Sequence, residues 1–317
     1  MTHNIFNQKI ALGAWAWGSG FRGGDQIFGN SFTEQDLKPV FEQATEKGLT
    51  LWDTAAVYGM GTSETILGSF IKEQQREKLI ISTKFTPQIA SNSEHPAQAM
   101  LNESKQRLHT DYVDIYWIHN NADVEKWTPE LISLAKSGQI KHIGVSNHNL
   151  EEIKLANSIL AKEGLKISAV QNHYSLMHRA SEESGVLDYC KENGIVFFAY
   201  MVLEQGALSG KYNSQNLFPE GSARAASYNA HLPKIEELTK VLEEIANNYD
   251  ASVAQIATAW AIAKGTLPII GVTKVGQVDD AAHAAQIELA ESEIAKIEET
   301  AKQLGISTIR EWESQMA

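Results

Sequence analysis

Four side chains in the first third of the chain carry groups that can donate, accept or orient a proton. Asp53 and Tyr58 lie in the segment WDTAAVYG. Lys84 lies in the segment ISTKF, and His119 ends the segment YWIH. Each group lies at or just past the end of a short apolar run, where a buried strand would finish. Together a carboxylate, a phenol, an ammonium and an imidazole can form one proton-delivery unit.

This combination suits the reduction of a carbonyl group. A carbonyl that accepts a hydride develops charge on its oxygen, which must then receive a proton. The phenol of Tyr58 can supply that proton if its pKa, about 10 when unperturbed, falls towards neutrality. A desolvated Lys84 anchored by Asp53 can lower it by about three units, or roughly 4 kcal/mol. We expect His119 to orient the substrate oxygen or to help relay the proton.

Short apolar runs alternate with helical patterns along the whole sequence. Strands are predicted at residues 10–15, 50–53, 79–84, 113–119, 142–146, 169–172, 195–200 and 267–271. Helices are predicted at residues 34–47, 63–72, 96–109, 128–137, 150–162, 182–193, 233–248, 252–264 and 291–304. This order predicts an α/β fold, a (β/α)8 TIM barrel with extra helices before and after the eighth strand. No linker interrupts the series, so residues 1–317 are predicted to form a single domain.

The predicted barrel explains how groups distant in sequence can meet. Active sites in this fold lie at the carboxyl ends of the strands. Asp53, Lys84 and His119 end the second, third and fourth predicted strands, which are neighbours. Tyr58 lies on the loop just after the second strand. We therefore expect all four side chains to converge at one end of the barrel.

Longer segments resemble the aldo-keto reductase family nearly from end to end. They are DTAxxYG from Asp53, GVSN from Gly144, VQN from Val170 and LEQGALSGKY from Leu203. The resemblance implies a TIM barrel and NADPH as the hydride donor. It also implies that Asp53, Tyr58, Lys84 and His119 form the catalytic tetrad.

The same resemblance implies where the cofactor binds. In the family an aromatic residue at the position of Tyr200 stacks on the nicotinamide, while Gln171 matches a contact to its carboxamide. Thr273 and Lys274 match contacts to a 2′-phosphate, beside a helix beginning near residue 275. The polar groups at residues 146, 147 and 171 can alternatively cap strand ends. The predicted cofactor-binding residues are Trp15, Ser146, Asn147, Gln171, Tyr200, Leu203, Gln205, Lys211, Arg224, Thr273, Lys274, Gln277 and Asp280.

A glycine-rich run, GSGFRG at residues 18–23, matches the GxGxxG pattern of dinucleotide-binding Rossmann folds. No helix signal follows it before residues 33–34, so we reject that interpretation and predict a flexible loop at the barrel mouth. Three loops, at residues 18–32, 120–126 and 212–231, are expected to shape the substrate pocket, the last as a candidate lid. Aromatic residues near the first loop can line the pocket or serve in plain packing. The predicted pocket residues are Trp17, Phe28 and Asn120.

Composition excludes several classes of function. A net charge of −12 and a pI near 5.3 argue against binding to nucleic acid or to anionic membranes. Cys190, the single cysteine, excludes an internal disulfide and is expected to be a buried, inert thiol. The histidines show no metal-ligand spacing, so no metal site is predicted, and His173 and His178 are expected in loops. No secretory signal or membrane span is visible, which predicts a cytoplasmic protein.

The sequence therefore predicts an NADPH-dependent enzyme that reduces aldehydes or ketones to alcohols, with Tyr58 as the proton donor. A small carbonyl compound is the expected partner, and the motifs specify neither its identity nor an oligomeric state. A second hypothesis is a cofactor-binding regulatory subunit, because part of the family resembles potassium-channel β subunits. A third, a metal-dependent TIM-barrel hydrolase, lacks the metal ligands it would need. Steady turnover of carbonyl compounds would distinguish the first two.

Overall fold

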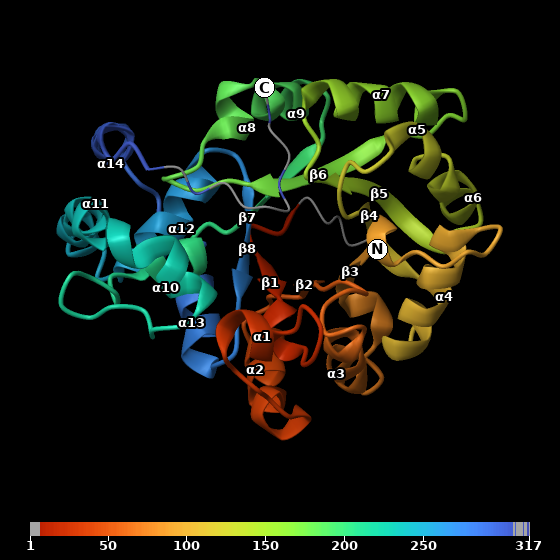
Figure 1. Cartoon of the computed structure of the whole chain (residues 1–317), viewed down its shortest axis with the longest axis horizontal. Coiled ribbons are helices and arrows are strands. Elements are labelled where there is room, and N and C mark those ends of the chain that lie inside the picture. The colour runs from red at the N-terminus through yellow and green to blue at the C-terminus, as the bar shows by residue number, and fades with distance from the viewer. Residues whose placement is uncertain (1–6, 307, 309–312, 314–315, 317) are drawn as a thin grey trace.

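A closed barrel of eight parallel strands forms the centre of the computed structural model, which describes residues 7–306, 308, 313 and 316 (Figure 1). Each strand pairs with its neighbours in chain order, and β1 pairs with β8 to close the barrel. The strands are β1 (Ala11–Gly13), β2 (Leu51–Asp53), β3 (Ile80–Phe85), β4 (Val113–Ile118), β5 (Ile140–Ser146), β6 (Ile167–His173), β7 (Val196–Tyr200) and β8 (Leu267–Gly271). The predicted (β/α)8 barrel is confirmed.

Helices surround this barrel (Figure 1). Those that follow the first six strands are α1 (Gly24–Phe28), α2 (Glu34–Glu46), α3 (Thr62–Ile71), α4 (Pro96–Arg107), α5 (Val124–Trp127), α6 (Glu130–Lys136), α7 (Leu150–Ala161), α8 (Ala180–Glu183) and α9 (Val186–Glu192). Between β7 and β8 lie α10 (Ala223–Tyr228), α11 (Leu232–Ala246) and α12 (Val253–Ala263), and after β8 come α13 (Val275–Ala284) and α14 (Glu291–Gln303). The helix predicted at residues 182–193 is divided in two, because Gly185 has a left-handed φ of 80°.

The interior of the barrel is filled by side chains rather than left as a channel. Buried residues from seven of the strands form this inner cluster: Ala11, Leu51, Ile80, Ile115, Trp117, Ala169, Phe198 and Leu267. The eighth, β5, places Gly144 opposite Trp117 of β4. A Cβ atom at Gly144 would lie 2.2 Å from Cε3 of Trp117, so the large indole requires a glycine there. A larger cluster of apolar side chains fills the layer between strands and helices.

The glycine-rich run at residues 18–23 leads directly into a helix, contrary to our expectation of a loop. That helix, α1, has five residues and packs so closely that a Cβ atom on Gly24 would lie 2.3 Å from the Ala16 carbonyl oxygen. The rejection of a Rossmann fold nevertheless stands, because the sheet is a closed barrel. The predicted loop at residues 212–231 also contains a helix, α10.

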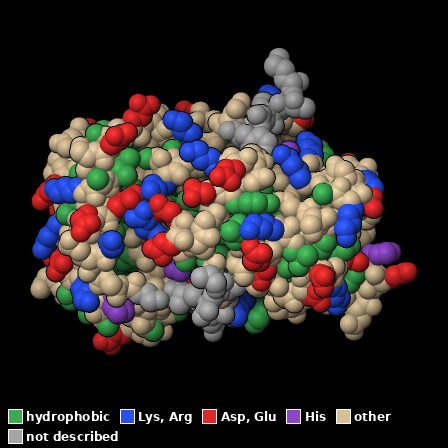
Figure 2. Space-filling view, turned by 90° about the horizontal axis from the view of Figure 1, so that it is seen from above, with side chains coloured by type: hydrophobic (Ala, Val, Ile, Leu, Met, Phe, Trp, Pro, Cys, Tyr) green, Lys and Arg blue, Asp and Glu red, His purple; other side chains and the backbone are tan. Residues whose placement is uncertain are grey.

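The surface mixes charges of both signs. Acidic and basic side chains are intermingled on the face shown in Figure 2. Cys190 lies inside, in α9, where 1% of it is exposed and burial raises the pKa of its thiol to about 12. Among the described residues, no helix is long and apolar enough to cross a membrane.

Candidate active site

A cavity of about 1240 Å³ opens at the carboxyl ends of the strands. Every strand contributes a lining residue at this end or immediately after it: Gly13, Asp53, Thr86, His119, Ser146, Gln171, Tyr200 and Gly271. The barrel therefore brings the residues predicted from strand ends to one opening, as the fold requires.

A buried ion pair lies at the wall of this cavity, which Asp53 lines. Lys84 is fully buried, and its Nζ donates to Asp53 Oδ2 at 2.5 Å and to the Thr54 carbonyl oxygen at 2.8 Å. Burial disfavours charge on the ammonium, but the nearby Asp53 carboxylate outweighs this effect and raises the pKa of Lys84. The same Nζ lies 3.4 Å from the hydroxyl of Tyr58. A permanent positive charge is thus held next to the phenol.

The second oxygen of Asp53 is fixed by two neighbours. Ser82 donates to Oδ1 of Asp53 at 2.6 Å, and the side-chain amide of Gln171 donates to it at 3.1 Å. Ser82 in turn accepts a hydrogen bond from Trp117 Nε1 at 2.5 Å. Sequence analysis missed Ser82, although its position two residues before Lys84 on the same strand places both side chains on one face.

Tyr58 is half-buried between two rings. Its phenol stacks on Trp15 with centroids 5.3 Å apart and meets His119 edge-on at 5.9 Å. Burial raises the pKa of Tyr58 above its ordinary value, and the Lys84 charge offsets only part of this effect. The expected lowering of this pKa is therefore wrong, because the sequence does not reveal how deeply the phenol is buried, and Asp53 also opposes its ionisation.

His119 directly follows β4, the strand that pairs with β3, where Lys84 lies. Its Nδ1 is 2.8 Å from the hydroxyl of Thr86, a residue that sequence analysis did not identify. Burial, reinforced by the charge of Lys84, holds the pKa of His119 well below its ordinary range. The imidazole is therefore neutral at neutral pH.

The backbone at the mouth is held in an unusual conformation. Asn147, Met201, Glu204 and Gln205 have φ angles of 59°, 60°, 46° and 52°. Such left-handed residues need support from their surroundings. Asn147 donates to the His119 carbonyl oxygen at 2.9 Å and accepts from the Tyr200 hydroxyl at 2.6 Å. These bonds fix the carboxyl ends of β4, β5 and β7 relative to one another.

Most predicted cofactor-binding residues line the cavity: Trp15, Ser146, Asn147, Gln171, Tyr200, Leu203, Gln205, Lys211, Arg224, Thr273, Gln277 and Asp280. Lys274 lies outside the lining, exposed at the beginning of α13. Two of the predicted pocket residues, Phe28 and Asn120, also line it.

Trp17 does not line the cavity, so its prediction as a pocket residue is wrong. It is fully buried, its Nε1 donates to the Val272 carbonyl oxygen at 2.6 Å, and its ring packs 5.0 Å from Trp52. Residues Trp15–Trp17 form a single 3-10 turn. Trp15 and Trp17 therefore point in different directions, which sequence spacing alone did not reveal.

The cavity extends to the N-terminus of α13. There the Gln277 side chain accepts hydrogen bonds from the backbone N–H groups of Thr273 and Lys274, at 2.7 and 3.0 Å. Asp280 accepts from the Gln255 amide at 2.8 Å. The volume exceeds the roughly 300–1,000 Å³ of ordinary ligand pockets. The cavity is therefore large enough for a dinucleotide, and Lys211 and Arg224 place positive charge along its wall.

Comparisons with known proteins agree with this fold. A profile described as the Aldo/keto reductase family matches residues 9–302. The chain is 30% identical to chloroplastic pyridoxal reductase of Arabidopsis thaliana, covering 95% of this chain and 85% of that protein. It is 31% identical to the Schizosaccharomyces pombe aldo-keto reductase yakc, whose name includes NADP(+), with 94% and 90% covered.

Solved structures agree as well. The glycerol dehydrogenase of Gluconobacter oxydans matches with a TM-score of 0.81 and 25% identity, covering 96% of this chain and 94% of that one. The chain therefore belongs to the aldo/keto reductase family. Members of this family are oxidoreductases that use NADP(H), the cofactor predicted from the sequence.

Proposed function

We propose that this protein reduces aldehydes or ketones to alcohols with NADPH and that Tyr58 donates the proton. The observation that carries the proposal is the position of the Tyr58 hydroxyl, 3.4 Å from a buried Lys84 ammonium and on the wall of the cavity. NADPH, when bound, supplies a hydride to the carbonyl carbon of the substrate.

Tyr58 acts as a general acid because its raised pKa keeps the phenol protonated at neutral pH. As the proton leaves, negative charge develops on the phenol oxygen. The Lys84 ammonium stabilises that charge most strongly at this moment, when the charge is forming. Asp53 keeps Lys84 charged and in place through the 2.5 Å hydrogen bond.

His119 positions the substrate oxygen as a neutral donor. When Nδ1 accepts a hydrogen bond from Thr86, the proton of the ring is on Nε2. This N–H can then donate to the carbonyl oxygen without adding a second full charge beside Lys84. The low pKa of His119 keeps the ring in this neutral form.

The remaining cavity residues would hold the cofactor. Tyr200 offers a ring face for the nicotinamide, and Asn147 is fixed beside it by the 2.6 Å hydrogen bond. Lys211 and Arg224 would contact the diphosphate. Thr273 lies at the far end, where Lys274 can turn from solvent towards a 2′-phosphate.

Replacement of Tyr58 by phenylalanine tests the proposal. We expect Tyr58→Phe to reduce carbonyl turnover by at least about 100-fold, the lower range for loss of a general acid. NADPH binding, followed by quenching of protein fluorescence, should stay nearly unchanged. Turnover of the variant at the rate of the unmodified protein would refute Tyr58 as donor. Cofactor binding without turnover of any small carbonyl by the unmodified protein would favour the regulatory-subunit hypothesis.

A further inference from the structure

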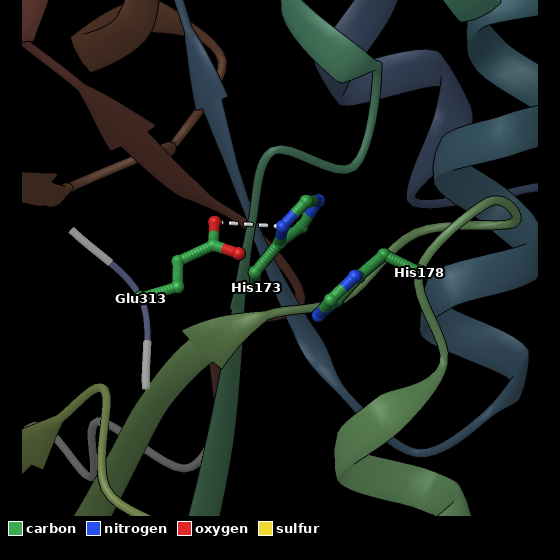
Figure 3. A group of neighbouring side chains, drawn as sticks. All are labelled: His173, His178 and Glu313. Carbon is green, nitrogen blue, oxygen red and sulfur yellow. Dashed lines mark ion pairs between the residues drawn. The ribbon is translucent and has the colours of Figure 1, made fainter. Parts of the chain in front are cut away.

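Two histidines and a glutamate meet beside the candidate active site, although sequence spacing gave no sign of a metal site. His173 is the last residue of β6 rather than part of a loop, and it is buried. Its Nδ1 lies 2.8 Å from Oε1 of Glu313, near the C-terminal end of the sequence. The ring of His178 stacks on His173 at 4.0 Å (Figure 3). One ligand atom from each residue lies within 4.8 Å of the other two.

A buried carboxylate fixes the orientation of His173. Oε1 of Glu204 lies 2.7 Å from Nε2 of His173, which directs Nδ1 towards Glu313. Glu204 is itself held by the hydroxyls of Ser175 and Tyr228, at 2.5 and 2.6 Å. Histidines that bind metals commonly donate their other ring N–H to a carboxylate in this way. His173 thus has the outer support that a metal ligand needs.

Two carboxylates flank the ring of His173, Glu204 at Nε2 and Glu313 at Nδ1. A dication bound at Nδ1 would contact the Glu313 carboxylate directly and would balance the negative charge of the two carboxylates. The ring of His178, stacked on His173, is the second imidazole within reach of that position.

We propose that Nδ1 of His173, the imidazole of His178 and the carboxylate of Glu313 form a binding site for a transition-metal dication such as Zn²⁺. Two imidazoles and a carboxylate are a ligand set that suits these ions. Ligands about 2.1 Å from a tetrahedral ion lie roughly 3.4 Å apart. Glu313 must therefore move back from His173 by roughly 0.6 Å, and the half-buried His178 must turn out of its stacked position.

No other group of three His, Cys, Asp or Glu side chains in the described part of the chain brings its ligand atoms so close together. Glu313 also lines the cavity and lies 3.2 Å from the Tyr200 hydroxyl. A bound ion would consequently link Glu313 to the barrel beside Tyr200. The proposal concerns binding of the ion and does not depend on the proposed reaction.

Cobalt(II) provides the test, because its visible absorption reports the number and geometry of its ligands. The full-length protein, without a polyhistidine tag and after treatment with a chelator, would be titrated with Co²⁺, with Zn²⁺ then displacing it. We expect one equivalent to bind with the strong absorption of a four-coordinate site. His178→Asn and Glu313→Gln should each weaken binding by at least about 10-fold, and Glu204→Gln by about 10- to 100-fold.

A matched control is His95→Asn, since that imidazole is 70% exposed and lies opposite Glu130 on the surface. It should leave Co²⁺ affinity unchanged. Circular dichroism would verify that each variant is folded, and His178 and Glu313 are chosen because neither lies in the barrel strands. Absence of stoichiometric binding, or equal affinity in the unmodified protein and in both ligand variants, would overturn the proposal.

Discussion

Asp53 and Lys84 form one unit, because each compensates the charge of the other inside the barrel. Loss of one partner leaves an uncompensated buried charge, which typically costs about 3–5 kcal/mol. We expect Lys84→Met and Asp53→Asn each to lower the free energy of unfolding by about that amount and to slow turnover. The double variant should be less destabilised than the sum of the singles, by at least about 1 kcal/mol. Urea unfolding of all four proteins measures this coupling; strictly additive losses would show that the two residues act independently.

The two perturbed pKa values define where the reaction should respond to pH. The reaction needs Tyr58 protonated, and its pKa is raised, so the rate should fall only as pH rises above the ordinary tyrosine value of about 10. It needs His119 neutral, and that pKa is lowered, so the rate should fall only as pH drops well below 6.5. We expect a flat profile between these limits.

Single-turnover rates measured across pH test this plateau, since they isolate the chemical step from product release. Tyr58→Phe serves as the control, because any remaining loss at high pH in that variant cannot arise from the phenol. An inflection near pH 7 to 8 in the unmodified protein would contradict the protonation states assigned here.

We expect the preference for NADPH over NADH to depend chiefly on Lys274, which is exposed at the beginning of α13. A charged hydrogen bond from Lys274 to a 2′-phosphate is worth about 1.5–3 kcal/mol, or roughly 10- to 150-fold in affinity. We expect Lys274→Ala to weaken NADPH binding by this factor and to leave NADH binding almost unchanged. Lys162→Ala, an exposed lysine at the end of α7, is the matched control. Equal affinities of the unmodified protein for the two cofactors would mean that Lys274 points away from the phosphate.

At the level of elements, the pairing of β4 with β5 requires a residue without a side chain, Gly144, opposite Trp117. Gly144→Ala would place a Cβ atom 2.2 Å from the Trp117 ring, and overpacking of this kind costs about 1–3 kcal/mol. Trp117 also donates to Ser82, which holds Asp53, so turnover should fall together with the melting temperature. Gly276→Ala in α13 is the control, because a Cβ atom there would extend into open space. Equal stability of the two variants would show that the interior can adjust.

Elements with a clear period were predictable and short ones were not. Continuous apolar runs gave all eight strands, because a strand buried on both faces carries few polar residues. Helices α1, α5 and α10 have six residues or fewer, too short to show a helical period. The break between α8 and α9 depends on the φ of a single glycine, Gly185.

The candidate site was predictable in its residue types but not in its environments. Strand ends identified Asp53, Lys84 and His119, because topology alone places them together. The raised pKa of Tyr58 depends on burial by neighbours distant in sequence. The position of the Trp17 side chain, in the core rather than in the cavity, depends on the direction of one 3-10 turn. Glu313 meets His173 only through the tertiary fold, so spacing could not predict their contact.

For the molecule as a whole, we propose that the chain folds as a single cooperative domain. Every strand is paired on both sides, so no part of the barrel can open without breaking the closed sheet. We expect tryptophan fluorescence and far-UV circular dichroism to follow one coincident transition in urea. Two separated transitions would indicate independent units. NADPH should shift the single midpoint upwards, because it binds the folded state.

The one cysteine of the sequence, Cys190, can report local opening of the native protein. Only a thiolate reacts quickly with thiol reagents, and Cys190 is both buried in α9 and held protonated by a pKa of about 12. Labelling therefore requires α9 to separate from β7, which it contacts. The rate of thiol modification, divided by the rate in the unfolded chain, gives the fraction of time for which α9 is separated from β7. The equilibrium for local opening of the native protein at α9 can thus be measured without introducing a probe.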